Sequence, residues 1–506
     1  MVYHTSQYVH KTVDDGKTWE IISPDLTAFE SDKQIVPGGP ITRDVTGEEY
    51  YSTIYAIRES TLQEGLIWVG ANDGPVHVTR DGGKIWSDVT PNMPKGGRVD
   101  AVEPSPHNPA KAYVAVLRYQ LDNDYSPYIY KTEDYGKTWE LLTTGTNGIP
   151  ADYPTRVIRE DPKQEGVLYA GTEFGLFISF DDGKNWQAFN NNLPVTPITD
   201  IKIHNDDLVM STMGRGFWIL DNIVSLRALA TVKDQQAHLF DLKDGIRNRM
   251  RAYSDYNGPD YPGMGVTIDY YIKDKDQSAK LEIINNKGQV VRSFVNGRPS
   301  PTVDTERDMS TEFAAPPAAG GLPNKQGINR YSWNMRHAGG WSDNPRRAFM
   351  GNGPMVSTGT YTARLTVGDQ VMEESFNVVL DPRVTLVNDA DVAEQERLAL
   401  EIQSFSNEVA MLVSAIDKER EALKNSLNTE KASRQDEKRK EELDAIYYKL
   451  VTPPGTYMQP MLQSQTGYLS SMIGQADQRP GQDAYDRLED LKNQFEAIKK
   501  EFQALK

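Results

Sequence analysis

The sequence predicts a mainly β protein, in which a β-propeller is followed by a β-sandwich and then by an α-helical bundle. A short motif recurs four times in the first part of the chain, at intervals of roughly 50 to 70 residues that suit propeller blades. After about residue 235 the pattern changes to short alternating strands, and after about residue 388 apolar residues recur at helical spacing. The predicted domains are therefore 1–224, 235–383 and 388–506.

The recurring motif consists of a hydroxyl residue, any residue, Asp, any residue, Gly, Lys, any residue and Trp. The Asp carboxylate can accept hydrogen bonds from the backbone N–H groups that follow, and Gly permits a tight turn. We expect each copy to form a hairpin, in which the Trp begins the returning strand and packs back across the turn. The Asp, Gly and Trp of the four copies are Asp14, Gly16, Trp19, Asp81, Gly83, Trp86, Asp134, Gly136, Trp139, Asp181, Gly183 and Trp186.

These residues resemble the Asp-box, or BNR repeat, of sialidase-type and sortilin-type β-propellers, and the resemblance covers residues 1 to about 224. In those families the Asp-box lies on the outer rim of the blade, away from the central site. The resemblance therefore implies a fold rather than an activity.

The strand pattern indicates three whole blades and two partial ones. The first partial blade, within residues 1–29, lacks an inner strand, and the last, within residues 198–220, lacks both an Asp-box and an outer strand. A four-bladed ring could close by joining the two partial blades. We instead expect further blades to complete the ring, supplied by an N-terminal half of the same protein or by a partner protein.

The middle of the chain shows the alternation expected of an antiparallel sandwich. A loop rich in Pro, Ala and Gly, 298–327, interrupts it. A Lys-Gly turn at Lys287, a Trp-Asn strand at Trp333 and a Gly-Thr-Tyr strand at Gly359 resemble, in their order, the Ig-like domain of flagellar hook-capping proteins. The predicted strands are 265–272, 279–284, 289–295, 329–335, 359–365 and 375–380.

The last part of the chain has two coiled-coil-like seams. Apolar residues step by three and four from Leu398 to Leu423, and again from Ala484 to Leu505. A charged helix near 430–450 and a shorter helix near 458–475 lie between them. Four antiparallel helices fit these lengths.

Composition excludes several kinds of function. The 506 residues include 55 basic and 72 acidic ones, and the resulting net charge of −17 disfavours nucleic acid or anionic lipid as a partner. The absence of cysteine excludes disulfides, thiolate catalysis and cysteine-ligated zinc. The seven histidines show no metal-ligand spacing, so we expect neither a metal site nor a cofactor. No apolar run is long enough to span a membrane, and the first residues do not form an export signal.

A glycosidase needs two carboxylates about 5 to 10 Å apart across a groove. The weak candidates are Asp44, Glu48 and Glu49, in the segment that enters the inner strand of the first whole blade. A solvated polar loop is the simpler interpretation of these acids. A sialidase-like site would instead need clustered arginines, although an arginine alone is more often an ion-pair partner. The arginines near suitable blade positions are Arg43, Arg118, Arg156 and Arg215.

The candidate binding residues are Tyr51 and three residues of one blade loop, Arg118, Asp122 and Asp124. Aromatic and acidic side chains in such a loop could contact a sugar or a peptide. The same residues also suit an Asx-rich turn between strands, which is the interpretation we favour.

The domain order resembles the C-terminal half of large sortilin-related Asp-box proteins of bacterial envelopes. That resemblance implies an extracytoplasmic location. We expect a non-catalytic scaffold or binding protein that recognises protein or glycan through a propeller face. The alternative is a glycoside hydrolase, sialidase-like or xyloglucanase-like, with its carboxylates on the channel face of the propeller.

Overall fold

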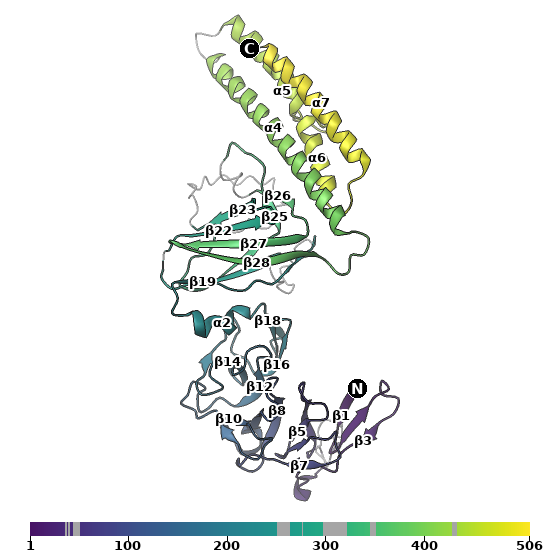
Figure 1. The fold of residues 1–506 in the computed structure, drawn as a ribbon, viewed down its shortest axis with the longest axis vertical. Coiled ribbons are helices and arrows are strands. Elements are labelled where there is room, and N and C mark those ends of the chain that lie inside the picture. The colour runs from purple at the N-terminus through teal and green to yellow at the C-terminus, as the bar shows by residue number, and fades with distance from the viewer. Residues whose placement is uncertain are drawn as a thin grey trace. The chain divides into compact units, whose positions relative to one another are not determined.

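The computed structural model describes residues 1–35, 38, 41–43, 51–249, 264–275, 277–296, 321–344, 351–427 and 433–505. The chain divides into two compact units, Met1–Ala230 and Thr231–Lys506 (Figure 1). The predicted mainly β class is confirmed, since sheets form the first unit and the beginning of the second, and long helices follow. The segments predicted as sandwich and as helical bundle both lie in the second unit.

Three four-stranded antiparallel sheets form the whole blades among the described residues of the first unit. In each blade the inner strand comes first in the sequence and the outer strand last. Blade 1 contains β4 (Ile54–Glu59), β5 (Ile67–Ala71), β6 (Val76–Thr79) and β7 (Trp86–Asp88). Blade 2 contains β8 (Arg98–Pro104), β9 (Ala112–Arg118), β10 (Asp124–Thr132) and β11 (Glu140–Leu141). Blade 3 contains β12 (Thr155–Glu160), β13 (Leu168–Thr172), β14 (Gly175–Ser179) and β15 (Gln187–Ala188).

Two three-stranded sheets flank the whole blades in the sequence. The first partial blade contains β1 (Val2–Thr5), β2 (Val9–Thr12) and β3 (Glu20–Ile21). The last partial blade contains β16 (Ile198–His204), β17 (Asp207–Thr212) and β18 (Phe217–Leu220). The described residues of the unit also form three short helices, which are η1 (Ser31–Lys33), α1 (Tyr119–Asp122) and α2 (Val224–Val232).

The core of the first unit lies between neighbouring blades. The second strands β5, β9 and β13 are buried at every position, because each has a paired strand on both edges and other blades against its faces. Successive inner strands are also neighbours. Gly70 of β5 makes this approach possible, since a Cβ atom there would lie 2.2 Å from Val99 of the next inner strand.

The second unit begins with a sandwich of a three-stranded sheet, β19-β21-β24, and a five-stranded sheet, β20-β28-β27-β22-β23. Trp333 lies fully buried in its core, with the rings of Tyr361 and Phe376 5.7 and 6.0 Å away. The strands are β19 (Ala237–Leu239), β20 (Gly245–Arg247), β21 (Val266–Ile272), β22 (Ala279–Asn285), β23 (Val290–Val295), β24 (Gly327–Trp333), β27 (Gly359–Val367) and β28 (Gln370–Leu380). A separate two-stranded sheet contains β25 (Arg336–Ala338) and β26 (Asn352–Met355).

Four helices follow in the described part of the chain, and their apolar seams pack into one core. The helices are α4 (Asp389–Leu427), α5 (Arg434–Leu450), α6 (Leu462–Gly474) and α7 (Gln482–Ala504). Buried Arg247 of β20 joins them to the sandwich, since it lies 2.9 Å from the Gln395 side-chain oxygen and 3.0 Å from the Asp477 carboxylate.

Candidate functional site

The inner strands share an irregularity near their beginning, at the second residue of β4, β12 and β16 and at the third residue of β8. In β4, β8, β12 and β16 the register with the second strand shifts there, so one extra residue stands opposite the partner strand. Such a β-bulge turns the side chain of the extra residue to a new direction. The four bulged residues are Tyr55, Asp100, Arg156 and Thr199.

These bulges lie at one edge of the blades, which we call the entry edge. It contains the first residues of the inner strands and the turns from each second strand to the third, because the strands are antiparallel. The Asp-box turns join third to fourth strands and therefore lie at the opposite edge.

A ladder of alternating charges crosses blades 2 and 3 at the entry edge. The guanidinium of Arg98 bonds the Asp100 carboxylate at 3.0 Å, and Asp100 lies 3.6 Å from Arg156, which pairs with Glu173. Burial raises the pKa of Asp100 above its ordinary value, although the two arginines favour its charged form. The two carboxylates neutralise the charges of the two arginines and hold their guanidinium groups in place.

The ladder also holds aromatic rings. The Arg98 guanidinium lies 4.8 Å from the centre of the Tyr55 ring, a cation–π contact. Arg156 donates to the Tyr119 hydroxyl at 3.4 Å, and the Tyr119 ring stacks on Tyr125 at 5.5 Å. Buried charged groups thus position rings whose other faces meet solvent.

Each of the three whole blades and the last partial blade exposes an aromatic ring at the entry edge. Phe174 lies in the turn between the second and third strands of blade 3 and packs 4.7 Å from Tyr153. Exposed rings fixed from behind suit stacking against flat, weakly polar ligands. The four exposed rings are Tyr55 (54 % exposed), Tyr125 (45 %), Phe174 (37 %) and Phe217 (83 %).

A second charge ladder lies further along the inner strands. Glu103 of β8 pairs with Arg58 of β4 and lies 3.6 Å from Arg159 of β12, which bonds Asp200 of β16 at 2.6 Å. Burial raises the pKa of Glu103, opposed by both arginines. Asp100 and Glu103 belong to one strand and each has two arginine neighbours, so they are not carboxylates facing each other across a groove.

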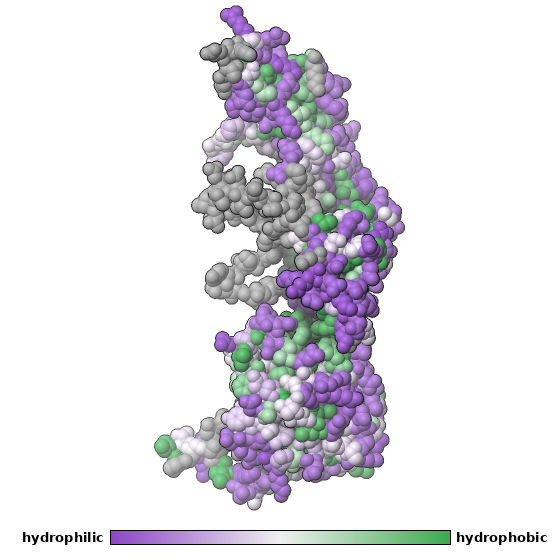
Figure 2. Space-filling model, turned by 90° about the vertical axis from the view of Figure 1, so that its left-hand side faces the viewer, coloured by the Kyte–Doolittle hydropathy of each residue, from purple (hydrophilic) through white to green (hydrophobic). Residues whose placement is uncertain are grey.

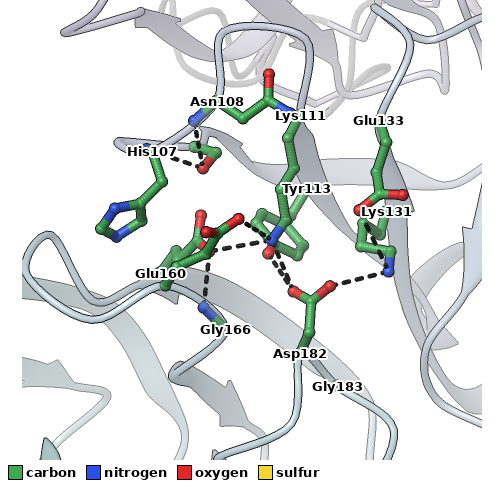
Figure 3. Close-up of polar contacts among 12 residues, drawn as sticks. His107, Asn108, Lys111, Tyr113, Lys131, Glu133, Glu160, Gly166, Asp182 and Gly183 are labelled. Atoms are coloured by element: carbon green, nitrogen blue, oxygen red, sulfur yellow. Dashed lines mark hydrogen bonds and ion pairs between the residues drawn. The ribbon is translucent and has the colours of Figure 1, made fainter.

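The opposite edge holds a third polar network, shown in Figure 3. Asp182, beside the Asp-box aspartate of blade 3, accepts bonds from Lys111 at 2.9 Å, Lys131 at 3.0 Å and the Tyr113 hydroxyl at 2.7 Å, all in blade 2. Lys111 also bonds Glu160 at 3.2 Å. These bonds run between residues of blades 2 and 3, so the cluster joins the two blades.

The predicted binding residues of the blade 2 loop form a structural anchor. Arg118 is buried, bonds Asp122 at 2.6 Å and Asp124 at 3.0 Å, and donates to the Pro94 carbonyl at 2.8 Å. Asp124 also accepts from the Ser126 N–H, the Asx turn favoured from the sequence. Arg118 therefore secures the segment that carries Tyr119 and Tyr125. Its direct contact with a ligand stays a prediction.

The structure describes three of the remaining candidates, Tyr51, Arg43 and Arg215. Tyr51 lies 5.4 Å from the Lys33 ammonium group, and burial raises its pKa. Arg43 and Arg215 are exposed, and the Arg215 carbonyl accepts from the Trp218 indole at 3.0 Å. Asp44, Glu48 and Glu49 fall outside the described residues.

The sequence pattern pointed to five residues of the entry edge, which are Arg118, Asp122, Asp124, Arg156 and Arg215. It did not point to Arg98, Asp100, Glu173, Tyr55, Phe174 or Phe217. A pattern that could have revealed them is the presence of charges inside continuous strands, as at Arg98, Asp100 and Glu103 of β8. A charged residue within an inner strand must find an opposite charge or water.

Figure 2 shows hydrophilic residues over much of the face in view, with hydrophobic ones in separate patches. Within the described ranges, no helix is long and apolar enough to cross a membrane. The same part of the chain contains no cluster of three or more His, Asp or Glu side chains placed to hold a metal ion.

Sequence comparisons link parts of the chain to known proteins, although no protein-family model matches it. A probable oligoxyloglucan-reducing end-specific xyloglucanase of Neosartorya fischeri is 25% identical over 261 residues, which cover 42% of this chain and 28% of that protein. Vacuolar protein sorting/targeting protein 10 of Laccaria bicolor is 34% identical over 112 residues, 22% of this chain and 7% of that protein. The chain thus spans less than a third of either relative.

Among solved structures, the GH74 xyloglucanase from Xanthomonas campestris is similar with a TM-score of 0.34 and 16% identity, covering 74% of this chain and 62% of that one. This TM-score is below 0.5, so the similarity does not define the blades. The blades are assigned from the strand order of each sheet.

Proposed function

We propose that the chain is a non-catalytic binding protein whose entry edge recognises a neutral polysaccharide. The observation that carries this proposal is the recurrence of an exposed aromatic ring in four successive blades, at Tyr55, Tyr125, Phe174 and Phe217. Rings repeated from blade to blade offer successive stacking positions to an extended polymer.

A neutral ligand fits the charges of this edge. The guanidinium groups of Arg98 and Arg156 already pair with Asp100 and Glu173. A charged ligand would have to compete with these buried partners, whereas hydroxyl groups can share their remaining hydrogen-bonding positions. The partial relationship to a protein named a xyloglucanase supports a glycan over a peptide. Because xyloglucan and similar cell-wall polymers lie outside cells, the proposal includes an extracytoplasmic location.

The second candidate is a glycoside hydrolase, favoured by the same relative. Its carboxylates would have to come from residues such as Asp44, Glu48 and Glu49, since Asp100 and Glu103 are held between arginines. We favour binding because the charged groups described at the entry edge are organised to hold rings in place, not to transfer protons.

The two candidates differ in turnover. Affinity electrophoresis and calorimetry of the full chain should use xyloglucan, mixed-linkage β-glucan, mannan and anionic polygalacturonate, with reducing ends assayed in parallel. We expect saturable binding to at least one neutral polymer, weaker binding to the anionic one, and no new reducing ends. Failure to bind any neutral polymer would refute the proposal. Hydrolysis lost in a Glu48→Gln/Glu49→Gln variant would establish the hydrolase instead.

A further inference from the structure

The Asp-box of each whole blade contacts the blade that precedes it in the sequence. The indole N–H of its Trp donates to a main-chain oxygen just after the outer strand of that blade. We call this contact between an Asp-box and the end of the preceding outer strand the clasp. A backbone oxygen gains a partner in this way, and the ring packs against the end of the strand. The three contacts are Trp86 to Ile22 at 2.8 Å, Trp139 to Val89 at 2.7 Å and Trp186 to Leu142 at 3.2 Å.

The Asp-box glycine belongs to the same clasp. A Cβ atom on Gly83, Gly136 or Gly183 would lie only 2.5 to 2.6 Å from an atom of Ile22, Val89 or Leu142, respectively. These glycines therefore serve the close approach of two blades as well as the turn itself.

At the Asp-box of the first partial blade, no described residue takes the place that Ile22, Val89 and Leu142 take in the three clasps. A Cβ atom on Gly16 would meet only the ring of Trp19 in the same box, at 3.8 Å. Trp19 is 46 % exposed, whereas Trp186 is 4 % exposed. Within the described residues, the Trp19 indole donates to no neighbouring blade.

The same blade has an unpaired inner edge. In the described part of the chain, β1 pairs only with β2, whereas the corresponding strands β5, β9 and β13 each pair on both edges. No residue of β1 is buried, whereas every residue of those three strands is. An unpaired strand edge is a template for another strand.

In blade 2, one continuous segment supplies both the residue in the clasp and the inner strand that pairs with the second strand. Residues 86–104 begin with the outer strand β7, place Val89 in the clasp of blade 2, and end with β8, which pairs with β9. We propose that the first partial blade is an interaction surface for a segment of this kind, an outer strand followed by an inner strand from another Asp-box blade.

The contacts define the chemistry of this partner. Its outer strand places an aliphatic residue and its carbonyl against Trp19, as Ile22, Val89 and Leu142 do in the existing clasps. The blade that carries this outer strand also presents a cation to Asp15 from the start of its second strand or from its third strand, as Lys111 and Lys131 do to Asp182. Asp15 has the same Asp-box position and left-handed backbone (φ 59°) as Asp182 (φ 60°).

A second copy of this chain does not supply that segment. Its inner strands β4, β8, β12 and β16 are each already paired within their own blades. Its last partial blade ends at β18, which is followed by α2 and not by an outer strand.

The test is a variant of the full chain with a copy of residues 86–111 inserted between Met1 and Val2. The copied β8 then leads into β1 through the turn that joins β8 to β9. We expect backbone amides of residues 2–5 to exchange about tenfold more slowly or better, and the Trp19 indole, assigned with Trp19→Phe, to become protected from solvent. The matched control carries the inserted residues in scrambled order.

Equal exchange in the variant and the scrambled control would overturn the proposal. If the insertion disturbs folding, a synthetic peptide of residues 86–104 added to the unaltered chain must slow the same amides saturably, and no slowing counts against the proposal. Sedimentation velocity adds an independent outcome, since a dimer of the unaltered chain abolished by Trp19→Ala would show that a second copy occupies the surface.

Discussion

The indole N–H of Trp139 donates to the main-chain oxygen of Val89, 2.7 Å away, and thereby joins blade 2 to blade 1. The ring also meets Trp68 of blade 1 edge to face, with centroids 6.2 Å apart. The sequence pattern alone suggests a Trp packed across its own turn, but in the whole blades the ring reaches the neighbouring blade. The Asp-box therefore stabilises the stacking of blades as well as a hairpin.

Alanine at an Asp-box glycine should separate these two roles. Gly136 and Gly16 have nearly the same backbone conformation, φ 84° and 83°, so each substitution carries the same cost of about 1 to 2 kcal/mol for a left-handed residue. Gly136→Ala also forces a Cβ atom to 2.6 Å from Val89. We expect it to lose about 1 to 3 kcal/mol more in unfolding free energy. Urea denaturation of both variants measures this difference. Equal losses of unfolding free energy in Gly136→Ala and Gly16→Ala would contradict a role of Gly136 in the contact between blades.

Acid should weaken the Asp-box turns. The Thr18 backbone N–H and hydroxyl, with the Thr12 hydroxyl, lower the pKa of Asp14 to about 2. Because the unfolded chain binds this proton near pH 4, the contribution to stability is complete above about pH 4 and is lost as the pH falls towards 2.

Carboxyl titration followed by NMR tests that shift. Asp14 should titrate near pH 2, and Thr18→Ala should raise its midpoint towards 4 because the 2.8 Å hydroxyl bond is removed. An Asp14 midpoint near 4 in the unaltered chain would contradict the proposed role of these bonds.

The parts predicted from the sequence are those set by local spacing. The turn at Asp134 depends on residues within a few positions, since its carboxylate accepts from Thr138 and Thr132. The seam of α4 from Leu398 onwards is likewise local and appears as predicted. The strands β25 and β26 escaped prediction because three or four residues are too few to show a period.

The entry edge depends on contacts between distant residues. Asp100 meets Arg156 only because two separate inner strands lie side by side with bulges at matching positions. Arg118, by contrast, was noticed for its acidic and aromatic neighbours, which are close in the sequence. Its buried anchoring role became visible only with the carbonyls of residues 94–96 around it.

The link between sandwich and helices should be sensitive to Arg247. Its guanidinium is buried, and it pairs with Asp477 and Gln395. We expect Arg247→Ala to destabilise the second unit by about 1 to 3 kcal/mol, because the substitution removes the buried donor to the Val356 carbonyl and to the Gln395 side-chain oxygen. Lys449→Ala, which breaks an exposed pair with Glu501, should change stability by less than about 1 kcal/mol. Similar thermal shifts for the two variants would contradict this assignment.

The most direct test of the proposed function is the affinity of a Tyr125→Ala/Phe174→Ala variant for the neutral polysaccharide bound by the unaltered chain. Loss of two stacking rings should weaken binding about tenfold or more, with unchanged thermal stability. The matched control is Tyr457→Ala/Tyr468→Ala, which removes two exposed rings of the second unit. A tenfold loss confined to the first variant supports recognition at the entry edge, and equal affinity of both variants would contradict it.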